Sequence, residues 1–144
     1  MSELMMLDAV RRENVNELTR LLNDGIDVDS KNAAGFTALY IACCRNQQEI
    51  VKVLLERNAN ANIKTNDYNS AMHELSRNGN NLLAELLIKY GVYINIRDMN
   101  GWTPLHEACE NGHVEFVELL LKMEPTSMPR TTKDLLPYIS FVVN

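Results

Sequence analysis

No stretch of this sequence approaches the ~20 consecutive apolar residues that a membrane-spanning helix needs. The segment from Met1 to Val10 also contains no lysine or arginine, and it carries Glu3 and Asp8 instead. A secretory signal begins with positive charge, so this start does not resemble one. We therefore expect neither a signal peptide nor an association with a membrane.

Cysteine and positive charge are both scarce. The chain has an odd number of cysteines, and the adjacent Cys43 and Cys44 are poorly placed to pair with each other. We expect free thiols, including Cys109, in a reducing compartment, the cytoplasm or the nucleus. With 14 Lys and Arg against 19 Asp and Glu, the net charge is −5. Phosphate binding needs a basic surface, so we expect no nucleic-acid partner.

A period of 33 residues runs through the sequence. The triplets that begin at Thr37, Ser70 and Thr103 keep this spacing, and so do apolar pairs near the end of each unit. The shared register has no insertion, which is strong evidence for a repeat. Helix-spaced apolar residues in the same register are expected to form the core: Leu18, Leu21, Leu22, Ile50, Val51, Leu54, Leu55, Leu83, Leu86, Leu87, Ile88, Phe116, Val117, Leu120 and Leu121.

Each unit is predicted to form two short helices joined by a turn. In the unit with the clearest signals, Thr103 can cap a helix over 103–111, and Pro104 suits its first position. Gly112 breaks this helix, and an apolar stripe predicts a second one over 114–122. Helices this short are marginal alone, so neighbouring units must cover their apolar faces.

The segment NGWTPLHEA at 100–108 resembles the ankyrin repeat, with GFTALYIA at 35–42 as a good second copy and YNSAMHEL at 68–75 as a degraded one. The resemblance implies an all-α solenoid of helix-turn-helix units joined by β-turn or hairpin loops. We expect a single domain over 1–144, divided into a cap-like repeat 1–31 and repeats 32–64, 65–97 and 98–130. Residues 131–144 are expected to form a half repeat or cap helix, and the alternative is a flexible apolar tail that docks a partner.

The resemblance also implies a function, since ankyrin domains bind partner proteins on a concave face made of turn tips and first helices. We expect a monomeric scaffold, adaptor or inhibitor that is not an enzyme and has no cofactor; the alternative is a regulatory domain cut from a larger enzyme or channel. The expected contacts are Phe36, Cys44, Arg45, Asn66, Asp67, Asn69, Arg77, Asn78, Met99, Asn100, Trp102, Glu110 and Asn111.

Two features refine this surface. Phe36 and Trp102 occupy equivalent turn tips, where a large aromatic suits an interface anchor, although each could instead cover a turn of the stack. Basic residues recur before the turns and on the first helices, whereas acidic residues fall on the second helices. This predicts a groove that prefers an acidic or phosphorylated segment; the alternative is a solvated face without bias. The basic residues are Lys31, Lys64, Arg97, Arg130, Arg11, Arg12, Arg45 and Arg77.

Other chemistry is not favoured. His106, Cys109 and His113 have helical spacing, but Gly112 interrupts it, and zinc wants four ligands. The family habit implies that His106 instead bonds Thr103 within the stack and that His73 bonds Ser70, which leaves the partner of Tyr40 open. Cys44 is expected to be exposed and oxidisable. The repeat 65–97 departs most from the pattern, so we expect it, or the ends, to open first.

Overall fold

The computed structural model describes residues 2–123, with side chains from residue 4 onward, and this part of the chain is all helical. The prediction of an all-α stack is confirmed. Eight helices make four pairs: α1 (Ser2–Arg11) with α2 (Val15–Asn23), α3 (Ala38–Cys44) with α4 (Gln48–Glu56), α5 (Ala71–Asn78) with α6 (Asn81–Lys89), and α7 (Pro104–Glu110) with α8 (Val114–Met123). The predicted half repeat 131–144 and Arg130 lie outside the described residues.

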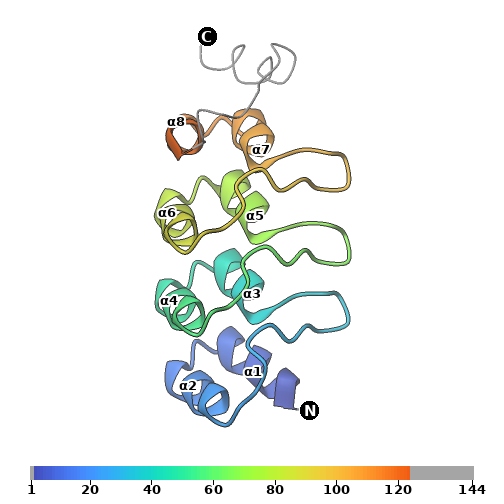
Figure 1. The fold of residues 1–144 in the computed structure, drawn as a ribbon, viewed down its shortest axis with the longest axis vertical. Coiled ribbons are helices and arrows are strands. Elements are labelled where there is room, and N and C mark those ends of the chain that lie inside the picture. The colour runs from blue at the N-terminus through green and yellow to red at the C-terminus, as the bar shows by residue number, and fades with distance from the viewer. Residues whose placement is uncertain (1, 124–144) are drawn as a thin grey trace.

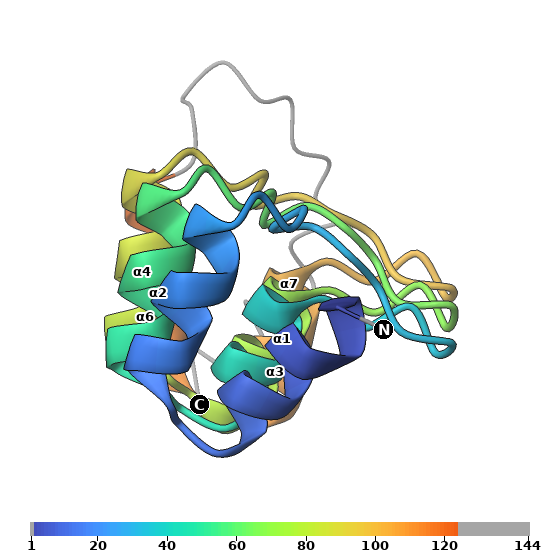
Figure 2. The ribbon, with the colours of Figure 1, turned by 90° about the horizontal axis from the view of Figure 1, so that it is seen from below.

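The four pairs stand in a row, and they do not surround a common centre (Figure 1). Within the described part, α1, α3, α5 and α7 contact one another in sequence and form one layer, while α2, α4, α6 and α8 form the second layer. Long loops leave the second layer, cross the first and end in tips on the far side (Figure 2). The first-layer helices therefore lie between the outer helices and the loop tips.

Local hydrogen bonds explain where the first-layer helices begin. Thr37, Ser70 and Thr103 each have an extended backbone, and each side chain accepts a bond from the backbone N–H three residues later. Such a bond satisfies one of the unpaired donors of the first turn. The expected cap at Thr103, with Pro104 at the first helical position, is confirmed.

Left-handed backbone recurs at three positions of the repeat. Every residue of the described part with positive φ lies between paired helices, just after a second-layer helix, or at a loop tip. At the tip, Gly35 is needed, because a Cβ there would lie 2.7 Å from the backbone nitrogen of Asn66 in the next tip. Tyr68 takes the equivalent place in the third repeat with φ of 63°. The residues between paired helices are Glu13, Asn46, Gly79 and Gly112; those just after a second-layer helix are Gly25, Asn58 and Gly91; and those at a loop tip are Gly35, Tyr68 and Gly101.

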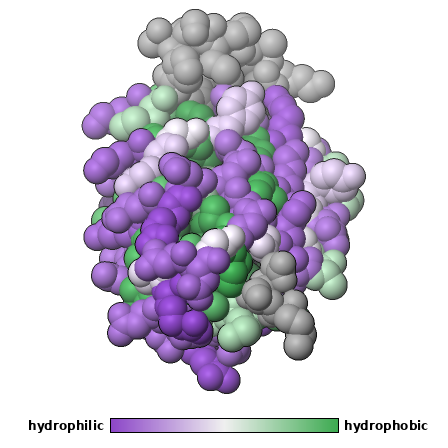
Figure 3. All heavy atoms as spheres, turned by 60° about the horizontal axis from the view of Figure 1, so that its bottom comes forward, coloured by the Kyte–Doolittle hydropathy of each residue, from purple (hydrophilic) through white to green (hydrophobic). Residues whose placement is uncertain are grey.

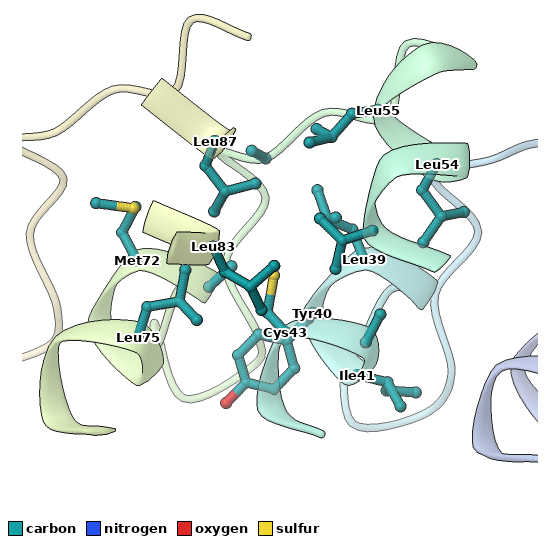
Figure 4. Close-up of a cluster of buried hydrophobic side chains, with 14 of the residues drawn as sticks. Leu39, Tyr40, Ile41, Cys43, Leu54, Leu55, Met72, Leu75, Leu83 and Leu87 are labelled. Carbon is teal, nitrogen blue, oxygen red and sulfur yellow. The ribbon is translucent and has the colours of Figure 1, made fainter. Parts of the chain in front are cut away.

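The core runs along the described part of the stack between the two layers. Figure 4 shows the part of it that the second and third repeats form. Leu54, Leu83 and Leu87 are almost completely buried, and aliphatic side chains from successive repeats meet there. Nearly all predicted core residues are buried or half-buried. Leu121 is the exception at 42% exposed, so its assignment to the core was wrong. It lies on the last described helix, where no further described repeat packs against it. The face of the molecule seen in Figure 3 is mostly hydrophilic, with hydrophobic residues visible in patches between the polar ones.

Candidate partner-binding surface

The loop tips are built alike and are internally braced. In each tip the backbone N–H of the first residue donates to a carbonyl four residues later, at 3.1 Å for Asn32, 2.8 Å for Thr65 and 2.9 Å for Asp98. The side-chain oxygen of the same residue accepts two backbone N–H bonds inside the turn. These bonds fix the tip conformation, so the tips are preorganised for contact.

The first two tips are also tied to each other. The backbone N–H of Asn66 donates to the carbonyl of Ala34 at 3.0 Å, and its side-chain amide donates to the carbonyl of Ala33 at 2.7 Å. Asn66 remains an exposed residue, as expected, but its amide nitrogen is committed to the neighbouring tip. A partner would therefore meet the remaining polar atoms of Asn66, and not its amide nitrogen or its backbone N–H.

The two candidate aromatic anchors differ in environment. Phe36 is half-buried, and its ring centroid lies 4.9 Å from that of Tyr40 on α3. Trp102 is 36% exposed, with its ring 5.7 Å from that of His106, and its carbonyl pairs with Nε2 of His73 at 2.8 Å. Packing against its own repeat accounts for much of the burial of the Phe36 side chain. Trp102 leaves more surface for contact.

Sequence analysis missed Tyr68, which stands at the third tip and is 55% exposed. The signal was present, because the repeat frame places Tyr68 where the neighbouring units have Gly35 and Gly101. Met99, on the next tip, is 65% exposed. Together with Trp102, these side chains give the last two tips a large share of exposed apolar surface.

A polar network crosses the first-layer helices and answers the open question about Tyr40. The amide nitrogen of Asn69 donates to the Tyr40 hydroxyl at 2.7 Å, and that hydroxyl donates to Glu74 at 3.2 Å. Arg77 donates to Glu74 at 2.6 Å and to Asn69 at 2.8 Å, and it forms an ion pair with Glu107 at 3.3 Å. Asn69 and Arg77 were expected to be partner contacts, and the structure places both inside this half-buried network.

Cys44 lies at the edge of this network and is exposed. Burial of its sulfur atom and then the nearby charge of Glu74 raise the pKa of the Cys44 thiol to about 11. Burial raises the pKa of Cys43 and Cys109 as well. The nucleophilic form of cysteine is the thiolate, so these thiols are weak nucleophiles near neutral pH.

The remaining predicted contacts are exposed on the tips or near the ends of first-layer helices, as the repeat frame expected. Asn111 donates its amide to the carbonyl of Glu107 at 2.8 Å and thereby closes the end of α7. These contacts are Arg45, Asp67, Asn78, Met99, Asn100, Glu110 and Asn111.

The charges of this surface change along the stack. Arg11 and Arg45, on the first two repeats, are exposed and form no ion pair with any described residue. Arg12 pairs with Asp8 at 3.2 Å. Toward the other end, Arg77 is shared by two glutamates. Unpaired positive charge therefore lies mainly on the first two repeats, and Arg97 of the third repeat donates to the carbonyl of Gly101 at 2.8 Å.

The histidines serve the stack. His73 is fully buried and pairs with Ser70 at 2.7 Å, and His106 pairs with Thr103 at 2.8 Å, so both implied bonds are confirmed. His113 reaches back to the carbonyl of Arg77 at 2.7 Å. Within residues 2–123 there is no group of three His, Cys, Asp or Glu that could hold a metal ion. The same span contains no helix that is both long and apolar enough to cross a bilayer.

Rows of helical hairpins with projecting loops define the class of α-helical solenoid repeat domains. The model for ankyrin repeats matches residues 3–67 and 58–129, and the chain therefore belongs to the ankyrin repeat family. Ankyrin repeats are in general protein–protein interaction modules and are typically non-catalytic.

Several curated proteins share parts of this chain. The human mitochondrial disaggregase is 40% identical over 58 residues, which is 40% of this chain and 8% of that protein. A putative ankyrin repeat protein of fowlpox virus is 38% identical over 72 residues, 50% of this chain and 17% of its own length. The glycerophosphocholine phosphodiesterase GDE1 of Candida albicans is 35% identical over 105 residues, 68% of this chain and 9% of that protein. The chain thus spans a small fraction of the length of these relatives.

Proposed function

We propose that this chain binds a partner protein or peptide on the surface made by its loop tips and first-layer helices, as a scaffold, adaptor or inhibitor. The observation that carries the proposal is the construction of the tips. Their backbones are held by repeated hydrogen bonds, and yet Tyr68, Met99 and Trp102 expose apolar surface to solvent. Exposed apolar side chains on a braced backbone suit a binding surface, because little backbone entropy is lost when they are covered.

The charge distribution suggests how a partner would lie. The unpaired Arg11 and Arg45 favour an acidic or phosphorylated segment over the first two repeats. Over the last two repeats, Glu74 and Glu107 already enclose Arg77, so apolar contact with the tips would dominate there. The expected ligand is thus a segment with its acidic part toward the N-terminal repeats and a bulky apolar part toward Trp102.

We also propose that the chain is not itself an enzyme and that it acts in the cytoplasm or the nucleus. Its thiols have raised pKa values, and its histidines are engaged in bonds within the stack. Three free cysteines suit a reducing compartment. The alternative is a regulatory ankyrin region of a larger protein. It is favoured by the small share of each curated relative that this chain matches, and the size of the natural gene product tests it.

An affinity capture experiment tests the binding surface. Trp102→Ala removes an exposed anchor, and Arg45→Glu reverses an unpaired charge without touching the core. Each is expected to reduce capture of the same partner by about tenfold or more, since anchor residues commonly carry 2 kcal/mol or more. Arg77→Glu is unsuitable, because it would cluster carboxylates without a cation and disturb the fold.

The matched control is Lys122→Glu, an exposed charge reversal on the outer helix α8. It is expected to leave capture unchanged, and circular dichroism confirms that each variant is folded. If Trp102→Ala and Arg45→Glu both bind the partner as the unaltered chain does, the proposed surface is wrong. Affinity that does not change with salt concentration would remove only the acidic-segment part of the proposal.

A further inference from the structure

Residues of α4 and α6 line an apolar groove on the outer layer. These two helices lie on the side of the molecule away from the loop tips (Figure 2). The volume of the groove is about 260 Å³. Leu82 and Leu86 of α6 supply apolar lining, and Lys52 of α4 and Lys89 of α6 also line the groove. Drug-sized ligands fill pockets of about 300–1,000 Å³, so this groove suits an inserted side chain better than a whole small molecule.

Leu82 is the unusual residue in this groove. It is 58% exposed, so it contributes little to the core. The second residue of each other outer helix is polar: Asn16 in α2, Glu49 in α4 and Glu115 in α8. The same fold therefore accepts a polar side chain at this position, and packing does not require a leucine.

The first turn of α6 also lacks a negative charge that would stabilise the helix. The first turns of α2, α4 and α8 contain Glu17, Glu49 and Glu115, whereas α6 has no acidic residue in its first turn. A carboxylate near a helix N-terminus is stabilised by the helix dipole. Leu82 thus replaces a residue type that would favour both folding and solubility.

The charges around the groove indicate the chemistry of an occupant. Lys52 and Lys89 are exposed, and neither forms an ion pair with any residue of the described part. Glu85 is the carboxylate among the residues that line the groove, so the lining has a net charge of +1 from two lysines and one glutamate. An apolar lining that includes two unpaired lysines complements an apolar side chain flanked by carboxylates.

We propose that this groove is a second docking site, which binds an acidic amphipathic helix of a partner protein. One large aliphatic or aromatic side chain of that helix packs on Leu82 and Leu86, and its flanking carboxylates face Lys52 and Lys89. The groove lies opposite the tip surface, so both sites can be occupied together. An adaptor that bridges two proteins needs such an arrangement.

The test uses the full chain and two synthetic labelled helical peptides. Both peptides present one phenylalanine on a leucine face; the first flanks it with glutamates, and the second has lysines in their place. By fluorescence anisotropy, the glutamate peptide is expected to bind at least fivefold more tightly than the lysine peptide. Leu82→Glu is expected to lower the affinity for the glutamate peptide at least tenfold, and Lys52→Glu is expected to lower this affinity to a smaller extent.

The repeat frame supplies the controls. Leu82→Glu is expected to fold with an unchanged or higher Tm, because Glu49 and Glu115 occupy the same position in other repeats. Because the tip surface is also proposed to bind an acidic segment, the comparison is repeated in a Trp102→Ala background. The loss of peptide binding caused by Leu82→Glu is expected to be the same there, which separates this groove from the tip surface. Equal binding of the two peptides, or equal binding to the Leu82→Glu variant, would overturn the proposal. Light scattering that shows a dimer which Leu82→Glu dissociates would also overturn it, because the groove would then be an interface between copies.

Discussion

Tyr68 holds a backbone conformation that its own side chain disfavours. Its φ is 63°, in the left-handed region, where Gly35 and Gly101 stand in the neighbouring repeats. This conformation costs a residue with a Cβ about 1–2 kcal/mol, because the Cβ approaches the following carbonyl oxygen. The cost falls within the repeat 65–97. Asn46 and Asn58 of the repeat 32–64 also have positive φ, but asparagine tolerates this region better than tyrosine, so the cost per residue is larger at Tyr68. Hydrogen exchange tests whether the repeat 65–97 opens before its neighbours.

The strain is isolated by comparing Tyr68→Gly with Tyr68→Ala. Both substitutions remove the ring and its contacts, but only glycine also removes the Cβ. Glycine makes the unfolded chain more flexible, which offsets about 0.4–1 kcal/mol of the gain. The glycine variant is therefore expected to be more stable than the alanine variant by about 0.5–1 kcal/mol.

Urea denaturation followed by circular dichroism measures this difference, which corresponds to about 1–4 °C in Tm for a chain of this size. Gly101→Ala is the matched control, since an added Cβ there meets nothing within 4 Å, and it should destabilise through the backbone alone. Gly35→Ala is not comparable, because its Cβ would collide with Asn66. If Tyr68→Ala is as stable as Tyr68→Gly while Gly101→Ala is destabilised, the strain assigned to Tyr68 does not exist.

Three further predictions concern buried or capped groups. Gln47 precedes α4 but does not cap it, and its side-chain oxygen is buried without a partner in the described part, whereas Asn80 at the equivalent place caps α6. Gln47→Asn is therefore expected to raise the free energy of unfolding, measured in urea, by about 0.5–1 kcal/mol, and a decrease would contradict the argument. Burial lowers the pKa of His73 below 6.5, so on acidification the unfolded chain takes up the proton before the folded chain does, and the free energy of unfolding should fall as the pH drops below about 6.5. In the His73→Gln variant, the urea midpoint should therefore depend less on pH between 7.5 and 5.5. A dependence as steep as in the unaltered chain would refute this role. Raising the pKa of the Cys44 thiol from 9.0 to about 11 lowers its thiolate fraction about 100-fold. A thiolate of higher pKa is a stronger nucleophile, which offsets about tenfold of this loss in the reaction rate. In a Cys43→Ala background, alkylation of Cys44 at pH 8 should thus be about tenfold slower in the folded chain than in urea, as mass spectrometry of the labelled peptide can show.

Features with a local cause could be predicted from the sequence. The cap at Thr103, the proline after it and the pairing of His73 with Ser70 involve residues at most three positions apart, so their geometry follows once a helix begins there. The 33-residue period then extends one unit to the whole stack. For this reason the helix pairs and nearly all of the core were foreseen.

The contacts between repeats could not be predicted in the same way. Asn69 bonds Tyr40 across 29 positions, and Arg77 bonds Glu107 across 30. Which side chains meet at these distances depends on how far each repeat is displaced from the next. The sequence therefore placed Arg77 correctly on a first-layer helix, but it could not show that two glutamates share its charge.

Departures from the repeat pattern separate into two kinds, and the difference bears on function. Asn69 occupies the repeat position at which Phe36 and Trp102 are aromatic. Its side-chain amide donates to the Tyr40 hydroxyl of the preceding repeat, and one repeat later the Trp102 carbonyl pairs in a similar way with His73. That departure is compensated inside the stack, and stability alone can explain it. Tyr68 and Leu82 have no such compensation: one holds a disfavoured backbone conformation, the other displaces a helpful charge, and both remain more than half exposed. Both residues cost stability and face solvent, and each belongs to one of the two proposed binding surfaces, Tyr68 on a loop tip and Leu82 on the outer helix α6.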